Sequence, residues 1–291
     1  MLRCARGHAF DIARQGYVSL LTPGRRAHPG DTAQMVLARS AFLAAGHYGG
    51  LARELARTVA AVLSLPSGSE TGPPAAEVPG CVADVGAGPG YYLAAVLDEL
   101  PGRAGLAIDA SRFALRRAAR AHQRIGAVAA DAWRDLPVAD GAAAAVLNVF
   151  APRDGAQLRR ILHPAGRLVV VTPEPAHLGE LVEALGLLVV DPRKDERLAA
   201  TLSPHFDLVQ RRHYGTVLAL DHAAVAAAVA MGPSSRHAAA DVLAGQIGRL
   251  PSPLPVTVSV TISVFQPGTA PRRDTDHRDS PDAPEVCRTE A

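Results

Sequence analysis

Short apolar runs alternate with segments of helical periodicity across the middle of the chain. The apolar runs predict strands at 81–86, 103–109, 126–131, 142–150 and 166–173. Between them, segments such as YYLAAVLDEL and the one that begins at Ser111 place apolar residues three or four positions apart, which predicts amphipathic helices. Strands that alternate with helices indicate an α/β fold, with helices on both faces of a parallel sheet.

Two later segments have a different pattern. In residues 205–220 and 255–265, apolar and polar positions alternate with a period of two. This period is typical of strands with one buried face. We expect them to complete a seven-stranded, mostly parallel sheet whose last strand is antiparallel.

The pattern before residue 81 predicts a short front segment and two helices. Residues 1–22 are basic and end in the alternating YVSLL. Asp31 is the predicted N-cap of a helix that Gly46 ends, and a second helix is predicted at 48–64. The predicted organisation is a front segment at 1–22, a helical connector and linker at 23–80, an α/β domain at 81–266 and a disordered tail at 267–291.

Composition adds limits rather than a function. The chain has 291 residues, 48% of them hydrophobic, and a formal net charge of +2, which gives no strong signal for a polyanionic partner. Lys194 is the single lysine, so arginine supplies almost all of the cations. No apolar run is long enough to span a bilayer and no signal-peptide core is present, so we expect a soluble cytoplasmic protein. The three cysteines do not suggest a disulfide framework.

The segment DVGAGPGYY, 84–92, is the most informative motif. Gly86, Gly88 and Gly90 follow a strand and precede a helix, where residues without a Cβ let the backbone pass close to a ligand. The spacing is not the G-x-G-x-x-G of a dinucleotide site. An acid, Asp84, stands at the strand end, where it would repel a phosphate but suit a cationic amino-acid group. The turn, with Pro89 inside it, therefore points to S-adenosylmethionine.

Polar residues also end the next three strands. Asp109 is placed to accept both ribose hydroxyls, and Asp131 with Ala132 is placed to bracket the adenine amino edge. The segment NVFAP at 148–152 would lie beside the transferred methyl group, which makes Asn148, Phe150 and Pro152 the pocket candidates. Singly, each has an ordinary structural interpretation. Together, at successive carboxyl ends of strands, they predict a Rossmann-like class I S-adenosylmethionine-dependent methyltransferase.

The sequence also resembles a known family. The stretches that carry this resemblance are CARGHAFDIARQGYVSLL, DTAQMVLARSAFLAAGHY, DVGAGPGYY, NVFAPR, VTPEPAHLGEL and MGPSSRH, and they extend over nearly all of 1–266. They are similar to the 23S rRNA guanine-N1 methyltransferases of the RlmA type, especially the branch associated with resistance to tylosin-like macrolides. The resemblance implies methylation of a guanosine in hairpin 35, of the nucleotide 748 class, and a homodimer that holds the RNA in its cleft. It also implies that Tyr48 and His177 contact the methyl donor.

The same resemblance bears on a metal. Cys4 and His8 have the spacing of half a zinc site, and family members carry a Cys-x-x-Cys pair upstream of it that this chain lacks. We interpret residues 1–22 as a truncated zinc-ribbon remnant. Either Met1 is an internal residue taken as the start, which we favour, or the ribbon has been lost. Structural zinc requires four ligands, so zinc is expected to bind only if the missing ones are restored. Arg236 stands where the family has an aromatic residue.

The N-terminal arginines are the candidate contacts for 23S rRNA. Few acidic residues occur in this part of the chain before Asp31. If these arginines contact RNA phosphates, RNA binding should weaken steeply as the salt concentration rises. The cluster consists of Arg3, Arg6, Arg14, Arg25, Arg26 and Arg39. For the proton on guanine N1 the candidate bases are Asp11, Asp84 and His177, and water also suffices; sequence does not rank them.

Two other functions remain open at this stage. A methyltransferase that acts on a small molecule would keep the donor site but would not need a basic N-terminal module. An RNA-binding protein without catalysis would keep the RNA contacts. A methyl-transfer assay on rRNA and on a panel of small acceptors separates them.

Overall fold

The fold is described by a computed structural model that covers residues 1–3, 7–21, 30–64, 77–188, 193–232 and 240–268. Several predicted features lie outside these described residues: Cys4, Arg6, Arg25, Arg26, Arg236, most of the linker and the tail from residue 269. No described helix is long and apolar enough to cross a membrane.

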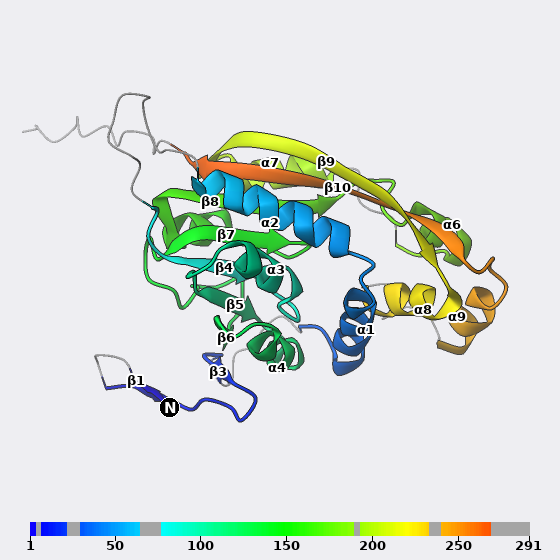
Figure 1. The fold of residues 1–291 in the computed structure, drawn as a ribbon, viewed down its shortest axis with the longest axis horizontal. Helices are drawn as coiled ribbons and strands as arrows, with labels where there is room; N and C mark the ends of the chain where they lie inside the picture. Colours follow the sequence, from blue (N-terminus) through cyan, green and yellow to red (C-terminus); the bar gives the residue numbers. More distant parts are fainter. Residues whose placement is uncertain (4–6, 22–29, 65–76, 189–192, 233–239, 269–291) are drawn as a thin grey trace, which may run out of the picture.

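An eight-stranded sheet forms the centre of the molecule (Figure 1). Its strands lie in the order β3-β6-β5-β4-β7-β8-β10-β9. Their bounds are Tyr17–Ser19 (β3), Cys81–Val85 (β4), Gly105–Asp109 (β5), Ile125–Ala129 (β6), Ala143–Val149 (β7), Leu162–Pro173 (β8), Phe206–Leu220 (β9) and Leu254–Pro267 (β10).

The topology confirms the α/β prediction and its antiparallel last strand. Strands β4 to β8 run parallel to one another, whereas β10 runs antiparallel to both β8 and β9. The seven predicted strands are all present, and β3 adds an eighth by pairing in parallel with β6. The segment YVS was assigned to the zinc-ribbon remnant because three residues carry too little pattern to identify an edge strand. The α/β sheet therefore begins before residue 22.

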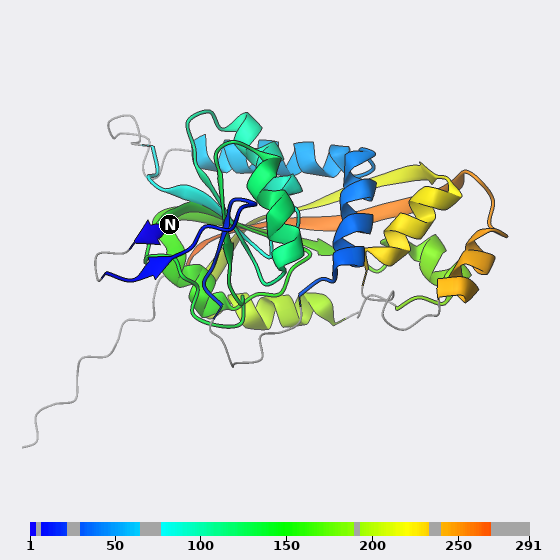
Figure 2. The same cartoon turned by 90° about the horizontal axis from the view of Figure 1, so that it is seen from below.

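Helices cover both faces of the sheet, as Figure 2 shows. Helices α2 to α4 lie on one face, and α5 and α7 lie on the other. The helix bounds are Ala33–Ala44 (α1), Gly49–Ser64 (α2), Tyr91–Glu99 (α3), Arg112–Ala121 (α4), Gly155–Ile161 (α5), Gly179–Leu185 (α6), Lys194–Leu202 (α7), His222–Ala230 (α8) and Ala240–Ile247 (α9).

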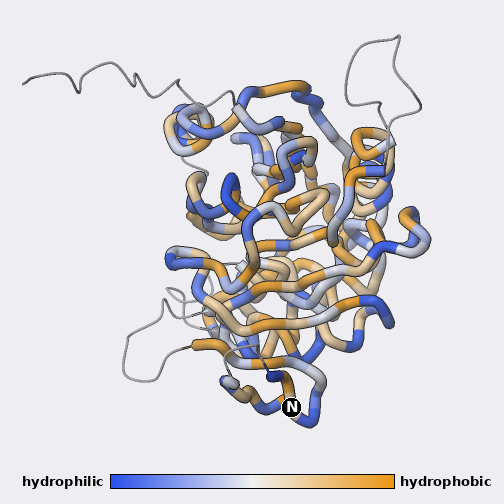
Figure 3. The backbone as a smooth tube through the Cα atoms, turned by 90° about the vertical axis from the view of Figure 1, so that its left-hand side faces the viewer, coloured by the Kyte–Doolittle hydropathy of each residue, from blue (hydrophilic) through white to orange (hydrophobic). Residues whose placement is uncertain are grey.

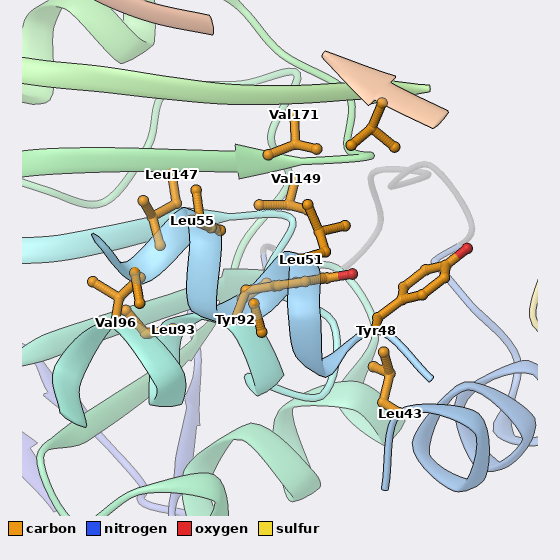
Figure 4. Packing of buried hydrophobic residues seen from close by; sticks show 14 of the residues in the cluster. Leu43, Tyr48, Leu51, Leu55, Tyr92, Leu93, Val96, Leu147, Val149 and Val171 are labelled. Carbon is orange, nitrogen blue, oxygen red and sulfur yellow. The ribbon is translucent and has the colours of Figure 1, made fainter. Parts of the chain in front are cut away.

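Alternation along the strands divides the apolar core into two clusters. Val82 of β4 and Leu147 of β7 face α2 and α3, whereas Ala83 and Val146 face α5 and α7. Figure 4 shows Leu51 and other α2 side chains near β7 and α3, with Tyr48 at the start of the same helix. Hydrophobic stretches run through the middle of the molecule (Figure 3). The larger cluster holds α2 firmly over the sheet and thereby fixes Tyr48.

Three predicted boundaries differ from the structure. Thr32, not Asp31, caps α1, because the Thr32 hydroxyl accepts the Met35 N–H at 3.2 Å while the Asp31 carboxylate pairs with Arg39. Strand β8 begins at Leu162, before its predicted start at Gly166. The end of the predicted linker is anchored, since the Arg103 guanidinium donates to the carbonyls of Val78 and Gly80.

The front segment lies far from helices α8 and α9. Strands β1 (Leu2–Arg3) and β2 (Ala9–Phe10) form a small exposed hairpin. It lies at the opposite end of the long axis from α8 and α9 (Figures 1 and 2). Within the described residues, no three His, Cys, Asp or Glu side chains are grouped to hold a metal ion. His8 lies in this exposed segment, and its predicted zinc role stays a prediction.

Candidate functional site

A cavity of about 650 Å³ opens where the strands β4 to β7 end. This is the carboxyl edge of the parallel sheet, where ligands of open α/β folds bind. Its volume lies within the range of small-molecule and cofactor sites. Most of the residues singled out in the sequence line it: Tyr48, Asp84, Gly86, Gly88, Pro89, Asp109, Asp131, Ala132, Phe150, Pro152 and His177.

The three glycines of the DVGAGPGYY turn have different parts. All have positive φ angles, between 54° and 81°, which residues with a side chain rarely adopt. A Cβ on Gly86 would lie 2.3 Å from the Ala151 Cβ, and one on Gly90 would lie 2.9 Å from the Ala118 Cα. A Cβ on Gly88 would meet nothing closer than an Arg39 nitrogen at 3.7 Å. Gly86 and Gly90 therefore allow close packing, and Gly88 leaves room in the cavity. Gly90 does not itself line the cavity.

Asp84 is the buried acid of the site. Only 1% of the residue is exposed, and among the residues that the structure describes its Oδ1 has no hydrogen-bond partner. Burial, together with the neighbouring Asp109 charge, raises the pKa of Asp84 to about 8. An unpaired buried carboxylate is unfavourable without a cation or a donor group. Asp84 also lines the cavity, so its carboxyl group fits the cationic end of an amino-acid ligand.

Asp109 and Asp131 are held by backbone N–H groups from their own turns. The Asp109 carboxylate accepts from Gly88 N at 2.8 Å and from Ser111 N at 2.7 Å. Asp131 Oδ1 accepts from Trp133 N at 3.0 Å. Burial raises the pKa of Asp109, although the two N–H groups oppose that rise. Each carboxylate oxygen can accept a second bond, so these acids remain able to receive ribose and adenine donors.

The three pocket candidates at the end of β7 differ in whether they reach the cavity. Phe150 and Pro152 line the cavity, but Asn148 is fully buried and lies outside its lining. Asn148 Nδ2 donates to the Val85 carbonyl at 3.0 Å and to the Pro152 carbonyl at 2.9 Å. Asn148 therefore positions the loop that carries Phe150 and does not reach the pocket. Sequence placed it at the right strand end but could not give the direction of its side chain.

Among the described residues, two with side chains have positive φ, and both line the cavity. Phe150 has φ 53° and Leu178 has φ 56°. Such a conformation costs about 1–3 kcal/mol for a residue other than glycine, and it concentrates at functional sites. At Phe150 the turn leaves the ring 38% exposed, between Tyr48, Tyr92 and His177 at centroid distances of 5.7 to 6.4 Å. The site therefore contains an exposed aromatic face beside the glycine turn.

Tyr48 and His177, 129 positions apart, meet across the cavity. The Tyr48 hydroxyl lies 3.2 Å from His177 Nε2, and His177 Nδ1 accepts the Ser259 N–H at 3.3 Å. Because Nδ1 is the acceptor, the neutral ring carries its hydrogen on Nε2 and donates it to Tyr48. Burial raises the pKa of Tyr48, so its phenol stays neutral. The resemblance brought in both residues, and the structure places them in one hydrogen-bonded pair.

The geometry also ranks the candidate bases. Asp11 is exposed and lies outside the cavity lining. The lone pair of His177 is occupied by the Ser259 N–H, so its cavity-facing nitrogen donates rather than accepts. Asp84 lines the cavity with a raised pKa, but the same carboxyl group is the one suited to a cationic ligand. In this arrangement none of the three is a dedicated base.

Sequence reasoning missed the wall that α1 and α8 contribute. Arg39 was predicted to contact RNA phosphates; instead it lines the cavity, pairs with Asp31 and donates to the Met231 carbonyl at 2.7 Å. A helical arginine gives no sequence signal for a carbonyl 192 positions away. Trp133, the only tryptophan of the chain, also lines the cavity, and 51% of it is exposed. Its place directly after Asp131 and Ala132 was the available clue.

Comparisons with known proteins agree with this picture. The chain is 50% identical over 267 residues, 91% of each chain, to the 23S rRNA (guanine(748)-N(1))-methyltransferase of Streptomyces fradiae. It is 49% identical over 91% of its length to a Micromonospora griseorubida protein, 90% of which is covered; that protein is provisionally given the same class of activity without a nucleotide number. No family model matches the chain. A Geobacter sulfurreducens methyltransferase solved with S-adenosyl-L-homocysteine matches 74% of this chain and 91% of its own, with 18% identity and a TM-score of 0.44.

Proposed function

Because the chain belongs to the 23S rRNA (guanine-N1)-methyltransferase family, we propose that it transfers a methyl group from S-adenosylmethionine to N1 of a guanosine in 23S rRNA. The observation that carries the proposal is the cavity at the carboxyl edge of the sheet, where an orphaned buried carboxylate, a glycine turn and two further acids face one space. The Streptomyces fradiae relative supports the nucleotide 748 class of target, and hairpin 35 is proposed from the family resemblance.

Different residues of the cavity would bind different parts of the methyl donor. Asp84 would hold its ammonium group, Gly88 and Pro89 its amino-acid backbone, Asp109 its ribose hydroxyls, and Asp131 with Ala132 its adenine edge. When bound, S-adenosylmethionine supplies a methyl group on a sulfonium, which would pass to guanine N1 as the C–S bond breaks, leaving the neutral thioether S-adenosylhomocysteine, while guanine N1 gives up its proton. Tyr48 and His177 would contact the donor from the opposite wall.

The role of the protein in this reaction is mainly positioning. The leaving group is already good, and a near-attack arrangement of the reacting atoms supplies several kcal/mol of the barrier. Phe150 presents an exposed ring on which the target guanine would stack, and Asn148 keeps the Phe150–Pro152 turn in place. The N1 proton would pass to water, because the three candidate bases are exposed or otherwise engaged.

Substrate access and assembly are part of the same proposal. A guanine inside a folded hairpin must be exposed by flipping or already be presented by the loop. Arg3 and Arg14 are exposed on the front segment and are offered as phosphate contacts. A homodimer, a cytoplasmic location and resistance to macrolides would follow from the family, and each is proposed on that ground.

A methyl-transfer assay tests the proposal. We expect protein-free 23S rRNA, or a transcript of the hairpin, to accept one methyl group per molecule, and nuclease digestion to release 1-methylguanosine. A panel of small acceptors should remain unmodified. Methylation of a small acceptor with no transfer to rRNA would favour the alternative, a small-molecule methyltransferase. RNA binding without transfer to either would favour a binding protein.

A further inference from the structure

A strip of arginine and tyrosine side chains crosses the face on which α2 lies between α3 and β9 (Figure 1). Arg53 and Arg57 are exposed on α2, four positions apart and therefore on one side of the helix. Arg212 and Tyr214 come from the same side of β9, and Tyr91 is the first residue of α3. These five residues are called the Arg–Tyr strip below.

Two glycines at the start of α2, Gly49 and Gly50, leave room for side chains of the strip to lie close together. A Cβ on Gly49 would lie 3.4 Å from Arg53 Nη1 and 3.8 Å from the Tyr91 hydroxyl. A Cβ on Gly50 would lie only 2.2 Å from the Tyr214 hydroxyl, so Tyr214 can cross the start of α2 only because residue 50 has no side chain. Burial raises the pKa of both tyrosines, and the Arg53 charge opposes the rise in each case. Arg53 therefore lies close enough to both phenol groups to affect them.

The strip has an excess of positive charge. Within the described residues, neither Arg53 nor Arg57 has a carboxylate within 4.0 Å, the limit for an ion pair. Arg212 lies 3.3 Å from Glu54, but 57% of one side chain and 31% of the other is exposed. Such exposed pairs contribute little and are readily exchanged for a new partner. Three guanidinium groups thus face solvent against a single acid.

The strip is continuous with the cavity. Tyr91 belongs to both, since it lines the cavity and lies beside Gly49. Tyr48, whose hydroxyl meets His177, is the residue directly before Gly49. A chain that leaves the cavity past Tyr91 therefore runs onto Arg53.

We propose that the Arg–Tyr strip is a binding surface for the RNA strand next to the target guanosine. This inference rests on the proposed function and adds a location for the substrate. Arg53, Arg57 and Arg212 contact phosphates, and Tyr91 and Tyr214 offer faces for unpaired bases; positive grooves with interleaved aromatic residues are typical of single-strand binding. A second copy of this chain bound through the same strip would place arginines opposite arginines. Their repulsion disfavours a homodimer through this surface.

The test is the double variant Arg53→Ala/Arg57→Ala, compared with Arg117→Ala/Arg120→Ala. The control removes the same charge from exposed positions of α4. The probe is a fluorescein-labelled transcript of the 23S rRNA hairpin, titrated by anisotropy at several salt concentrations. We expect the test variant to bind at least tenfold more weakly, and the slope of log K against log salt to fall by about 1.5, as for two lost phosphate contacts. The control should stay within twofold of the parent protein.

A donor titration separates this surface from the donor site. Trp133 fluorescence reports S-adenosylhomocysteine binding, and the test variant should retain the parent's affinity within twofold. Unchanged RNA affinity and salt slope in Arg53→Ala/Arg57→Ala would overturn the inference, and so would an equal loss in the control pair. A change in sedimentation with unchanged RNA binding would assign the strip to a protein partner instead. Failure of the proposed function would appear differently, as a parent protein that leaves the hairpin unmethylated.

Discussion

The two walls of the cavity are built in different ways. The sheet wall consists of Asp84, Gly86, Gly88, Asp109 and Asp131, at the ends of β4 to β6. Asp109 and Asp131 each accept an N–H from two positions away, those of Ser111 and Trp133, and Asp109 also accepts the Gly88 N–H of the neighbouring turn. The helix wall depends on bonds between residues far apart in sequence, Tyr48 with His177 and Arg39 with Met231. The sheet wall is therefore a local property of its turns, whereas the helix wall exists only once the whole chain has folded.

The largest effect is expected from Gly86, which joins the sheet wall to the Phe150 turn. In Gly86→Ala the new Cβ would lie 2.3 Å from the Ala151 Cβ on a backbone with φ 81°. We expect a loss of about 3 kcal/mol in the free energy of unfolding. Gly102→Ala is the matched control, because Gly102 has φ 85° and open space around its Cβ position; a loss of about 1 kcal/mol is expected there. Denaturant titration measures both, and equal losses would contradict the packing role.

Asp84→Asn tests the sheet wall without changing its shape. Donor affinity at pH 8.5 should fall about 100-fold, because an amide cannot pair with an ammonium group as a carboxylate does. Stability should not fall, since the variant no longer buries an unpaired acid. Calorimetry with S-adenosylhomocysteine and a thermal melt give the two values. Asp98→Asn, at an exposed position, is the control and should leave both unchanged. Loss of fold in Asp84→Asn would mean that Asp84 is structural.

The contrast between the walls also explains what sequence could predict. The D-x-G-x-G-x-G turn and the strand-end acids are contiguous signals, so the sheet wall and the seven strands followed from spacing alone. Tyr48 and His177 came from resemblance, because nothing in a single sequence joins positions 129 apart. The place of Arg39 in the cavity lining was missed for the same reason. Strand β3 was missed because three residues do not establish a period, and the direction of Asn148 is decided by two carbonyls that only the fold brings near.

His177 is the residue through which the helix wall is expected to act. In His177→Ala, kcat/KM for rRNA should fall about 30-fold, because Tyr48 loses the donor that orients it. In His177→Gln an amide N–H can replace the ring Nε2–H, so most activity should return. The double variant His177→Ala/Tyr48→Phe should be little worse than either single one, since both remove the same hydrogen bond. Additive losses, or a pH profile that shifts in His177→Gln, would show instead that His177 works as an independent acid or base.

The smallest expected effect is a pH dependence of folding stability and of donor affinity that arises from Asp84 in the sheet wall. The pKa of Asp84 is about 8 in the folded protein, above its value in the unfolded chain, so the folded state binds more protons between about pH 4 and pH 8. The stability of the ligand-free protein should therefore decline as pH rises through this window, and Asp84→Asn should lack that decline. Donor binding has the opposite slope, because only the ionised carboxylate attracts the ammonium group. From pH 6.5 to pH 8.5, affinity for S-adenosylhomocysteine should rise about 25-fold in the parent protein. In Asp84→Asn this affinity should stay constant, so the difference in affinity between the parent protein and the variant should become smaller toward acid pH. A parallel rise in both proteins would place the titrating group elsewhere and remove Asp84 from the account of donor recognition.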